Sequence, residues 1–206
     1  MTVSLHELLL YAGGLAILWA IPGPVWVALV ARALSGGMAR AWPLALGVAL
    51  GDVIWSICAV FGLAWILSLY GDFLTVLRWA AAGMFLVMGV ALLVKQPPPP
   101  NANKALNRPG LLAGVAVGFA VVIGNPKAVL FYMGLLPGFF DLTRVTGPDI
   151  AAIALLSGSV PFLGNLLLAL SFDRARRLLS SPSALRRLNI ISGLLLMSVG
   201  VAIPFL

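Results

Sequence analysis

Six long apolar runs constrain this sequence of 206 residues more than any other feature. Crossing the roughly 30 Å of hydrocarbon in a bilayer takes a helix of about 20 residues, and each run is close to or above that length. The runs are continuous, unlike the alternating segments of about ten residues that build outer-membrane barrels. Only 9% of the residues are charged, far below the roughly 25% of soluble domains. The sequence therefore predicts an all-α integral membrane protein with six transmembrane helices, at about 8–31, 42–67, 73–94, 110–137, 150–172 and 188–205.

The stretch 96–109 divides the chain into two halves, 1–95 and 110–206. It contains four consecutive prolines and several polar residues, which predicts an exposed linker and not a span. The turn before the third span, Tyr70-Gly71-Asp72, is tight. We therefore expect one transporter domain over 1–206, built from two halves with three spans each.

Lys and Arg collect in the first, third and fifth loops of this arrangement. Arg32 and Arg40 flank the first of these loops, and we expect both side chains to lie on a solvated or lipid-facing surface. Lys and Arg accumulate on the cytoplasmic side of membrane proteins. The odd loops are therefore predicted to be cytoplasmic, and both termini are predicted to face outward.

The two halves contain similar helix breakers and similar pairs of small and polar residues in the same order. IPGP at 21–24 corresponds to GNPK at 124–127, and Gly51-Asp52 corresponds to Gly164-Asn165. Because three is an odd number of spans, a duplicated half must insert upside down, as in many transporters. Two inverted three-helix repeats are the prediction, and chance similarity between two apolar sequences is the alternative.

Helix breakers lie near the middle of the first and fourth spans. Pro22, Gly23 and Pro24 interrupt the first, and Asn125 with Pro126 interrupts the fourth. A helix that restarts at such a point exposes N–H groups and a positive dipole end, which bind anions. Irregular backbone at this depth survives only where protein or water covers it. We expect a central cavity suited to a carboxylate; simple proline kinks are the alternative.

Two full charges are predicted to lie deep in the membrane. Asp52 and Lys127 each lie ten residues from a predicted span end, or about 15 Å. Such charges cost about 2.5–3.5 kcal/mol at a helix centre and usually face a cavity. We expect the two side chains to approach each other or share waters, with Asp52 able to carry protons; a static ion pair is the alternative. Asn165, matched to Asp52, completes the site or bonds across helices. Among the tryptophans, Trp26 and Trp55 are candidates to line the cavity.

The sequence offers little support for other chemistry. The lone Cys58 can form neither an internal disulfide nor a redox pair. No metal-ligand cluster, nucleotide motif or nucleophile–base pair is visible in the sequence. We therefore expect no enzyme activity, no cofactor, no metal site and no nucleic-acid partner.

The chain resembles the LysE/RhtB superfamily of bacterial amino-acid exporters over nearly its whole length. The resemblance lies in Pro22-Gly23-Pro24, in Gly47-x-x-x-Gly51-Asp52, and in Asn125-Pro126-Lys127 followed by Leu136-Pro137. It implies an inner-membrane secondary carrier that exports amino acids or their derivatives, driven by the proton-motive force. Its partners would be a small amino-acid substrate, protons and membrane lipid. A metal-cation exporter of a related branch, a non-transporting scaffold and a homodimeric assembly all stay open at this point.

Overall fold

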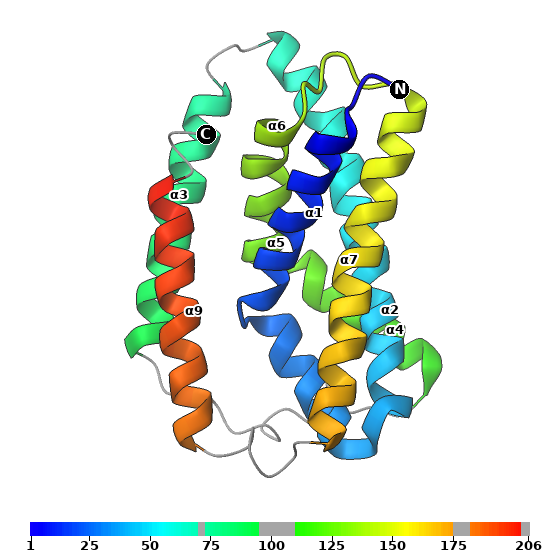
Figure 1. Cartoon of the computed structure of the whole chain (residues 1–206), viewed down its shortest axis with the longest axis vertical. Helices are drawn as coiled ribbons and strands as arrows, with labels where there is room; N and C mark the ends of the chain where they lie inside the picture. The colour runs from blue at the N-terminus through cyan, green and yellow to red at the C-terminus, as the bar shows by residue number, and fades with distance from the viewer. Residues whose placement is uncertain (70–72, 95–109, 175–181, 203–206) are drawn as a thin grey trace.

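The computed structural model describes residues 1–69, 73–94, 110–174 and 182–202, and every regular element in these ranges is helical. The predicted all-α class is therefore confirmed. The helices run roughly along one long axis, with the N-terminus and the C-terminal end of α9 at the same end (Figure 1). In chain order they are α1 (Leu5–Ala20), α2 (Pro24–Leu69), α3 (Phe73–Val94), α4 (Leu111–Ile123), α5 (Pro126–Leu130), the π-helix η2 (Phe131–Leu135), α6 (Leu136–Phe139), α7 (Gly147–Arg174) and α9 (Pro182–Ala202). The predicted linker 96–109 and the predicted turn 70–72 lie outside the described residues.

Among the described residues, two stretches of helix are long and apolar enough to cross a membrane unaided, Gly36–Gly62 and Gly147–Ser171. Two bent pairs in the same part of the chain raise this number to as many as four if each pair is one interrupted span. The predicted third and sixth spans fall on α3 and α9, where shorter apolar helices cover Ala82–Ala91 and Gly193–Ala202. The arrangement of six spans in two inverted repeats stays a prediction.

The first break separates α1 from α2 and bends the chain by 64° between Leu5–Ala20 and Pro24–Ala33. Ile21 ends α1 in an extended conformation. Pro24 is the first residue of α2, where its missing N–H costs nothing and its fixed φ suits a helix start. The break therefore follows directly from the two prolines in the sequence.

The second break separates α4 from α5 and bends the chain by 54° between Leu111–Ile123 and Pro126–Phe139. Asn125 is the N-cap of α5, and its side-chain oxygen accepts a hydrogen bond from the backbone N–H of Lys127 at 3.2 Å. Asn is among the best N-cap residues, and Pro126 follows at the first helical position. Both predicted interruptions are thus present as helix ends and restarts.

The long helix α2 is a hairpin. Its first part descends from the break, and its second part returns along the long axis (Figure 1). The turn is made at Gly36 and Gly37, whose backbone angles are not helical. Gly37 has φ 63°, in the left-handed region that favours glycine.

The returning part of α2 packs between α4 and α7, and α7 also packs on α1. Small residues bring α2 and α4 together. A Cβ atom added at Gly47 would lie 2.0 Å from the carbonyl oxygen of Val115, and one at Gly118 would lie 2.0 Å from that of Leu44. Glycine is therefore required at this contact, as expected of small residues between membrane helices.

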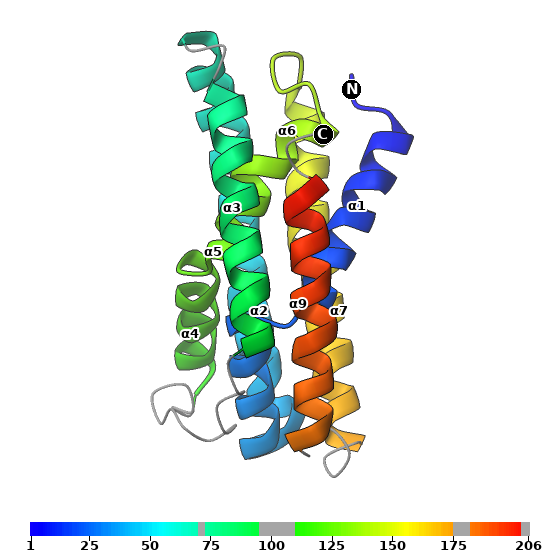
Figure 2. The same ribbon diagram turned by 90° about the vertical axis from the view of Figure 1, so that its left-hand side faces the viewer.

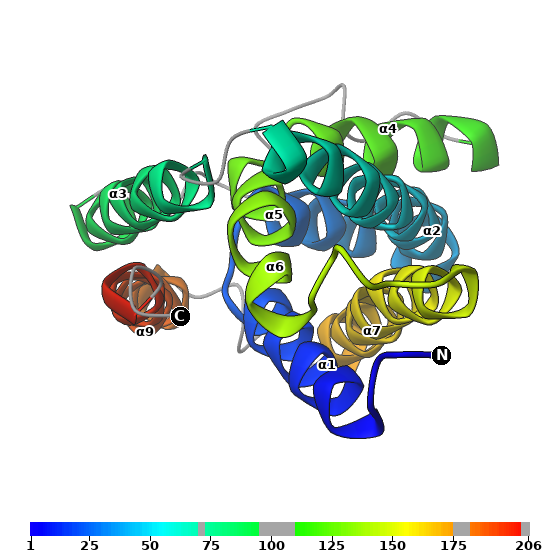
Figure 3. The same cartoon turned by 90° about the horizontal axis from the view of Figure 1, so that it is seen from above.

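Helices α3 and α9 form a pair beside the other helices, as the view along the long axis shows (Figure 3). They run side by side for most of their length (Figure 2). The pair is close because Gly89 and Gly193 face each other; a Cβ at either would lie 2.7 Å from the carbonyl oxygen of the other. The pair meets the other helices partly through η2.

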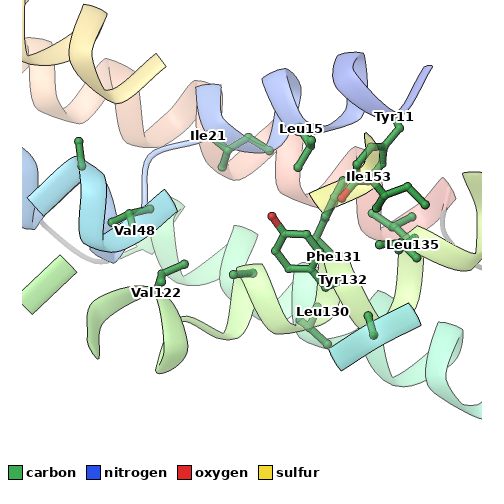
Figure 4. Packing of buried hydrophobic residues seen from close by; sticks show 14 of the residues in the cluster. Tyr11, Leu15, Ile21, Val48, Val122, Leu130, Phe131, Tyr132, Leu135 and Ile153 are labelled. Carbon is green, nitrogen blue, oxygen red and sulfur yellow. The ribbon is translucent and has the colours of Figure 1, made fainter. Parts of the chain in front are cut away.

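The buried core lies where α1, α2, α5, η2 and α7 converge. Figure 4 shows apolar side chains from these elements packed around the rings of Tyr11, Phe131 and Tyr132. Within this mostly apolar region, a few polar side chains are almost completely buried, and they define the site described next.

Candidate functional site

A cavity of about 40 Å³ lies between the two helix breaks. Space of this size accepts about three water molecules. Its wall is mostly apolar, with a small number of polar groups from different helices. The lining residues are Leu15, Leu18, Trp19, Val25, Trp26, Val48, Asp52, Val122, Asn125, Lys127, Ala128, Pro161 and Asn165. The cavity therefore combines residues from both halves of the chain.

The ammonium group of Lys127 links the two breaks. Its Nζ atom donates hydrogen bonds to the carbonyl oxygens of Leu18 at 2.9 Å and Ile21 at 2.6 Å. These carbonyls belong to the last turn of α1 and to its C-cap Ile21, where the helix end carries a negative partial charge. The carbonyl of Leu18 also accepts a hydrogen bond from the backbone N–H of Ile21 at 3.3 Å. Gly23 lies against the same ammonium group, since a Cβ added there would be 3.6 Å from Nζ. Lys127 is only 5% exposed, and these hydrogen bonds to backbone carbonyls satisfy its buried ammonium group.

Two tryptophans complete the wall near α1. The indole N–H of Trp26 donates to the carbonyl oxygen of Trp19 at 2.7 Å, satisfying a further carbonyl at the first break. The indole N–H of Trp19 donates to Oδ1 of Asn165 at 3.1 Å, which ties α1 to α7. Trp26 was a candidate lining residue from the sequence, and Trp19 was not. Trp55 is not among the lining residues.

Asn165 is fully buried and has an unused donor. Its Oδ1 atom accepts from Trp19, whereas its Nδ2 atom has no hydrogen-bond partner among the described residues. A buried amide donor without a partner costs free energy unless a water or ligand reaches it. Because Asn165 lines the cavity, its amide is placed to bind a group that enters there.

Asp52, from the returning part of α2, is the one carboxylate among the described residues that line the cavity. It is 5% exposed and lies on the same cavity as Lys127. The two charges act on each other across the cavity, but no direct ion pair joins them in the part of the chain described here. Instead, Lys127 is held by backbone carbonyls, and Asp52 lies near the hydroxyl of Tyr132. Tyr132 lies outside the residues that the sequence analysis singled out.

The four remaining residues predicted for the site, Pro22, Gly23, Pro24 and Pro126, shape the breaks without lining the cavity. Pro126 instead contributes to a separate apolar cavity of about 290 Å³, with Met84, Ile123, Gly124, Val129 and Leu130. Asn125 does line the central cavity, but its side chain already caps α5. Of the residues at the start of α5, Asn125 and Lys127 line the cavity, and the binding of an anion at the helix ends stays a prediction.

Arg32 is buried, contrary to the prediction from the sequence. The sequence predicted a solvated or lipid-facing basic residue beside a loop, but Arg32 is only 1% exposed. The first part of α2 continues past it, so that Arg32 lies within a helix, close to Gly114 on α4. Its Nη1 atom donates to the carbonyl oxygen of Arg40 at 3.4 Å. Glycine at position 114 leaves the room that the guanidinium group occupies.

Comparison with known proteins identifies the family. A family model described as LysE type translocator matches residues 16–204, which include every lining residue of the cavity except Leu15. The chain belongs to the LysE type translocators. Members of this family are transporters, and the family resemblance drawn from the sequence motifs is confirmed. No solved structure matches the chain at a significant level.

Relatives of this LysE type translocator include membrane proteins and efflux proteins. An uncharacterized membrane protein of Synechocystis sp. is 30% identical over 98% of this chain and 97% of its own length. The leucine efflux protein of Klebsiella pneumoniae is 24% identical over 80% of this chain and 79% of its own length. The putative amino acid efflux protein YcgF of Bacillus subtilis is 26% identical over 55% of this chain and 54% of its own length.

Proposed function

We propose that this chain is a secondary transporter of the bacterial inner membrane that exports amino acids or their derivatives in exchange for protons. The observation that carries the proposal is the shared cavity, which places one carboxylate, Asp52, and one ammonium group, Lys127, in an otherwise mostly apolar wall. An amino acid carries one group of each opposite sign on its α-carbon. The carboxylate of the substrate binds Lys127, and its ammonium group binds Asp52.

The two charged side chains of the cavity wall, Asp52 and Lys127, also favour a substrate with an uncharged side chain. Both ionic side chains of the wall are used by the α-carboxylate and α-ammonium groups. A charged substrate side chain would then meet aliphatic and indole surface without a counter-ion, which is strongly unfavourable. The efflux proteins named among the relatives, one of them for leucine, support this class of substrate.

Transport requires the cavity to change size. Glycine, the smallest amino acid, already has more non-hydrogen atoms than the space of about 40 Å³ holds waters. The structure therefore represents a contracted form of the site, and binding must widen it. The breaks at 21–23 and 124–125 are the natural hinges, since hinges are short segments at helix ends that absorb backbone rotation.

Two inverted repeats, one before and one after the linker 96–109, account for the helix contacts. In this arrangement, the first broken span, α1 with the first part of α2, corresponds to the second broken span, α4 with α5, η2 and α6. The returning part of α2 then corresponds to α7. Helix α3 corresponds to α9. The contact of α2 with α4 is then matched by that of α7 with α1, and both are present. Alternating access follows when the two halves rock around the central site.

The orientation proposed is the one with both termini outside. Among the residues whose side chains are described, Arg186 and Arg187 are exposed near the start of α9, at the end of the molecule opposite the N-terminus (Figure 1). Arg40, also exposed, follows the turn of α2 at that same end. Positive charge favours the cytoplasmic side. The polar ends of α1 and α7 then face outward.

The proposal is tested by counterflow in proteoliposomes containing the purified protein. Labelled leucine and valine should exchange, labelled lysine and glutamate should not, and a pH gradient should drive net leucine movement. The Asp52→Asn variant should lose gradient-driven movement, whereas Asp141→Asn, which changes an exposed carboxylate, should behave as the parent protein. Absence of exchange for every amino acid, from protein shown to be inserted and folded, would refute the proposal; divalent cations would be tested next.

A further inference from the structure

Three buried hydroxyl groups, those of Tyr11, Ser157 and Tyr132, form a row in the core beside the cavity. The hydroxyl oxygen of Tyr11 on α1 lies 2.6 Å from Oγ of Ser157 on α7, and both side chains are fully buried. Ser157 donates its own hydrogen to the carbonyl oxygen of Ile153 at 2.7 Å. Because a serine hydroxyl has one hydrogen, Tyr11 is the donor in its bond to Ser157.

Tyr132 connects this row to the cavity. It is fully buried in η2, and its hydroxyl lies close to both Asp52 and Ser157 without a completed hydrogen bond to any described residue. In Figure 4 the Tyr132 hydroxyl points away from its own helix into the core. A π-helix is rare, often marks a functional site, and here sets the direction of Tyr132. An unpartnered hydroxyl in a mostly apolar core indicates a function beyond packing.

The row leads from the cavity toward the outer end of the molecule. On α7, Asn165 lines the cavity, and Ser157 lies eight residues nearer the N-terminal end, about 12 Å along the axis. Between them stands Pro161, which has no N–H and leaves the carbonyl of Ser157 without its usual helical donor.

Aromatic rings close the outer end of the row. The ring of Tyr11 packs edge-on against Phe139 and Phe140, with centroid distances of 5.5 and 5.1 Å. Helix α6 ends at Phe139, and the exposed Asp141 directly follows Phe140. Displacing these two rings would connect the Tyr11 hydroxyl with water, while their present packing separates it from solvent.

We propose that Tyr132, Ser157 and Tyr11 form a proton path between Asp52 and the outer end of the transporter. This inference rests on the proposed proton-coupled function and assigns the route that the proton takes. A proton from outside binds the Tyr11 oxygen, and Tyr11 passes its own proton to Ser157. Ser157 turns its hydrogen from Ile153 toward Tyr132, and Tyr132 passes its proton to the Asp52 carboxylate. Each O–H bond broken is replaced, so the three hydroxyls end unchanged and Asp52 ends as the neutral acid.

The groups that face Asp52 fit this assignment. Lys127 acts on it from α5, Tyr132 from η2, and Tyr11 at longer range from α1. Among these, Lys127 is occupied by the carbonyls of the first break, so its ammonium group is not the immediate proton donor. A hydroxyl both donates and accepts a hydrogen bond, and the path therefore needs no second carboxylate.

The test separates proton movement from substrate exchange in the same proteoliposomes. Substrate counterflow at equal pH needs no net proton transfer, whereas gradient-driven leucine movement and substrate-coupled pH change, read by an entrapped dye, do need it. Tyr132→Phe and Tyr11→Phe should keep counterflow within about twofold and lose about tenfold or more of the proton-coupled signals. Ser157→Ala should behave in the same way. Retained counterflow also shows that each variant is folded.

A matched control exists on the same helix. Ser171 donates to the carbonyl of Leu167 at 2.8 Å, as Ser157 does to Ile153, but it is exposed. Ser171→Ala should therefore match the parent protein in both assays. Parent-like proton coupling in Tyr132→Phe overturns the proton path, as does equal loss of counterflow and coupling in Tyr132→Phe and Tyr11→Phe. If the parent protein exchanges amino acids without any pH effect, the coupling assumed in the proposed function fails, and the path fails with it.

Discussion

The ammonium group of Lys127 donates a hydrogen bond of 2.6 Å to the carbonyl oxygen of Ile21, a residue 106 positions earlier in the chain. One side chain at the second break thus holds the open helix end of the first. A cation at the C-terminal end of a helix is favourable, and more so away from water. A substrate carboxylate that binds Lys127 must compete with these carbonyls. Binding would thereby loosen the contact that fixes the two breaks.

Replacing Lys127 should therefore abolish transport. Lys127→Met removes the charge but keeps much of the apolar stem, and we expect leucine counterflow to fall about 30-fold or more, as for loss of one partner of a buried charged contact. Lys127→Arg should recover only part of it, because a planar guanidinium does not replace a compact ammonium. The exposed Arg144 provides the control: Arg144→Ala should transport normally. Normal counterflow in Lys127→Met would remove Lys127 from the site.

Asn165 should contribute to affinity more than to turnover. Asn165→Ala removes an amide of the cavity wall whose Nδ2 atom has no hydrogen-bond partner among the described residues. One hydrogen bond to substrate corresponds to about a 3- to 10-fold increase in the leucine concentration that gives half-maximal counterflow. Ser198→Ala, on the exposed side of α9, is the control. An unchanged concentration dependence would show that Asn165 only joins α7 to Trp19.

The close contact of α2 with α4 should not tolerate even a methyl group. A Cβ at Gly118 would lie 2.0 Å from the carbonyl oxygen of Leu44, so Gly118→Ala must push two backbones apart. We expect a loss of stability of about 1–3 kcal/mol, measured as lower thermal stability in detergent. Gly83 is also in a helix but has no atom within 4 Å of an added Cβ. Gly83→Ala should leave stability unchanged or raise it, and equal effects of the two substitutions would contradict the close contact.

Asp149 should anchor the N-terminal segment. Its carboxylate accepts hydrogen bonds from the backbone N–H groups of Thr2, Val3 and Thr146 at 2.9–3.1 Å, and it is completely buried. Asp149→Ala leaves these donors without partners, which should cost about 1–3 kcal/mol. Thermal unfolding in detergent measures the effect. The exposed Asp141, whose side chain bonds only Thr143 among the described residues, is the comparison, and Asp141→Ala should change little. Identical unfolding of the two variants would argue against the anchor.

Much of the fold is predictable because it depends on local chemistry. The prolines at 22, 24 and 126 interrupt helices wherever they stand, and the structure has both interruptions. The helix boundaries near the turn of α2 were predicted less accurately. Gly36 and Gly37 reverse the chain there with little loss of helical structure, so that helix extends into the predicted loop. Arg32 was misplaced for the same reason, since the helix continues beyond the residue expected to begin a loop.

The sequence by itself determined that this protein is an all-helical membrane chain with two broken helices and a deep acid and base, because these features follow from composition and from the geometry of proline. Only the tertiary structure decided what the deep charges contact. Lys127 binds the carbonyls of the first break, and Asp52 meets the hydroxyl of Tyr132. These pairings join residues more than 75 positions apart in the sequence. They arise from helix packing and a π-helical turn, which no local pattern in the chain specifies.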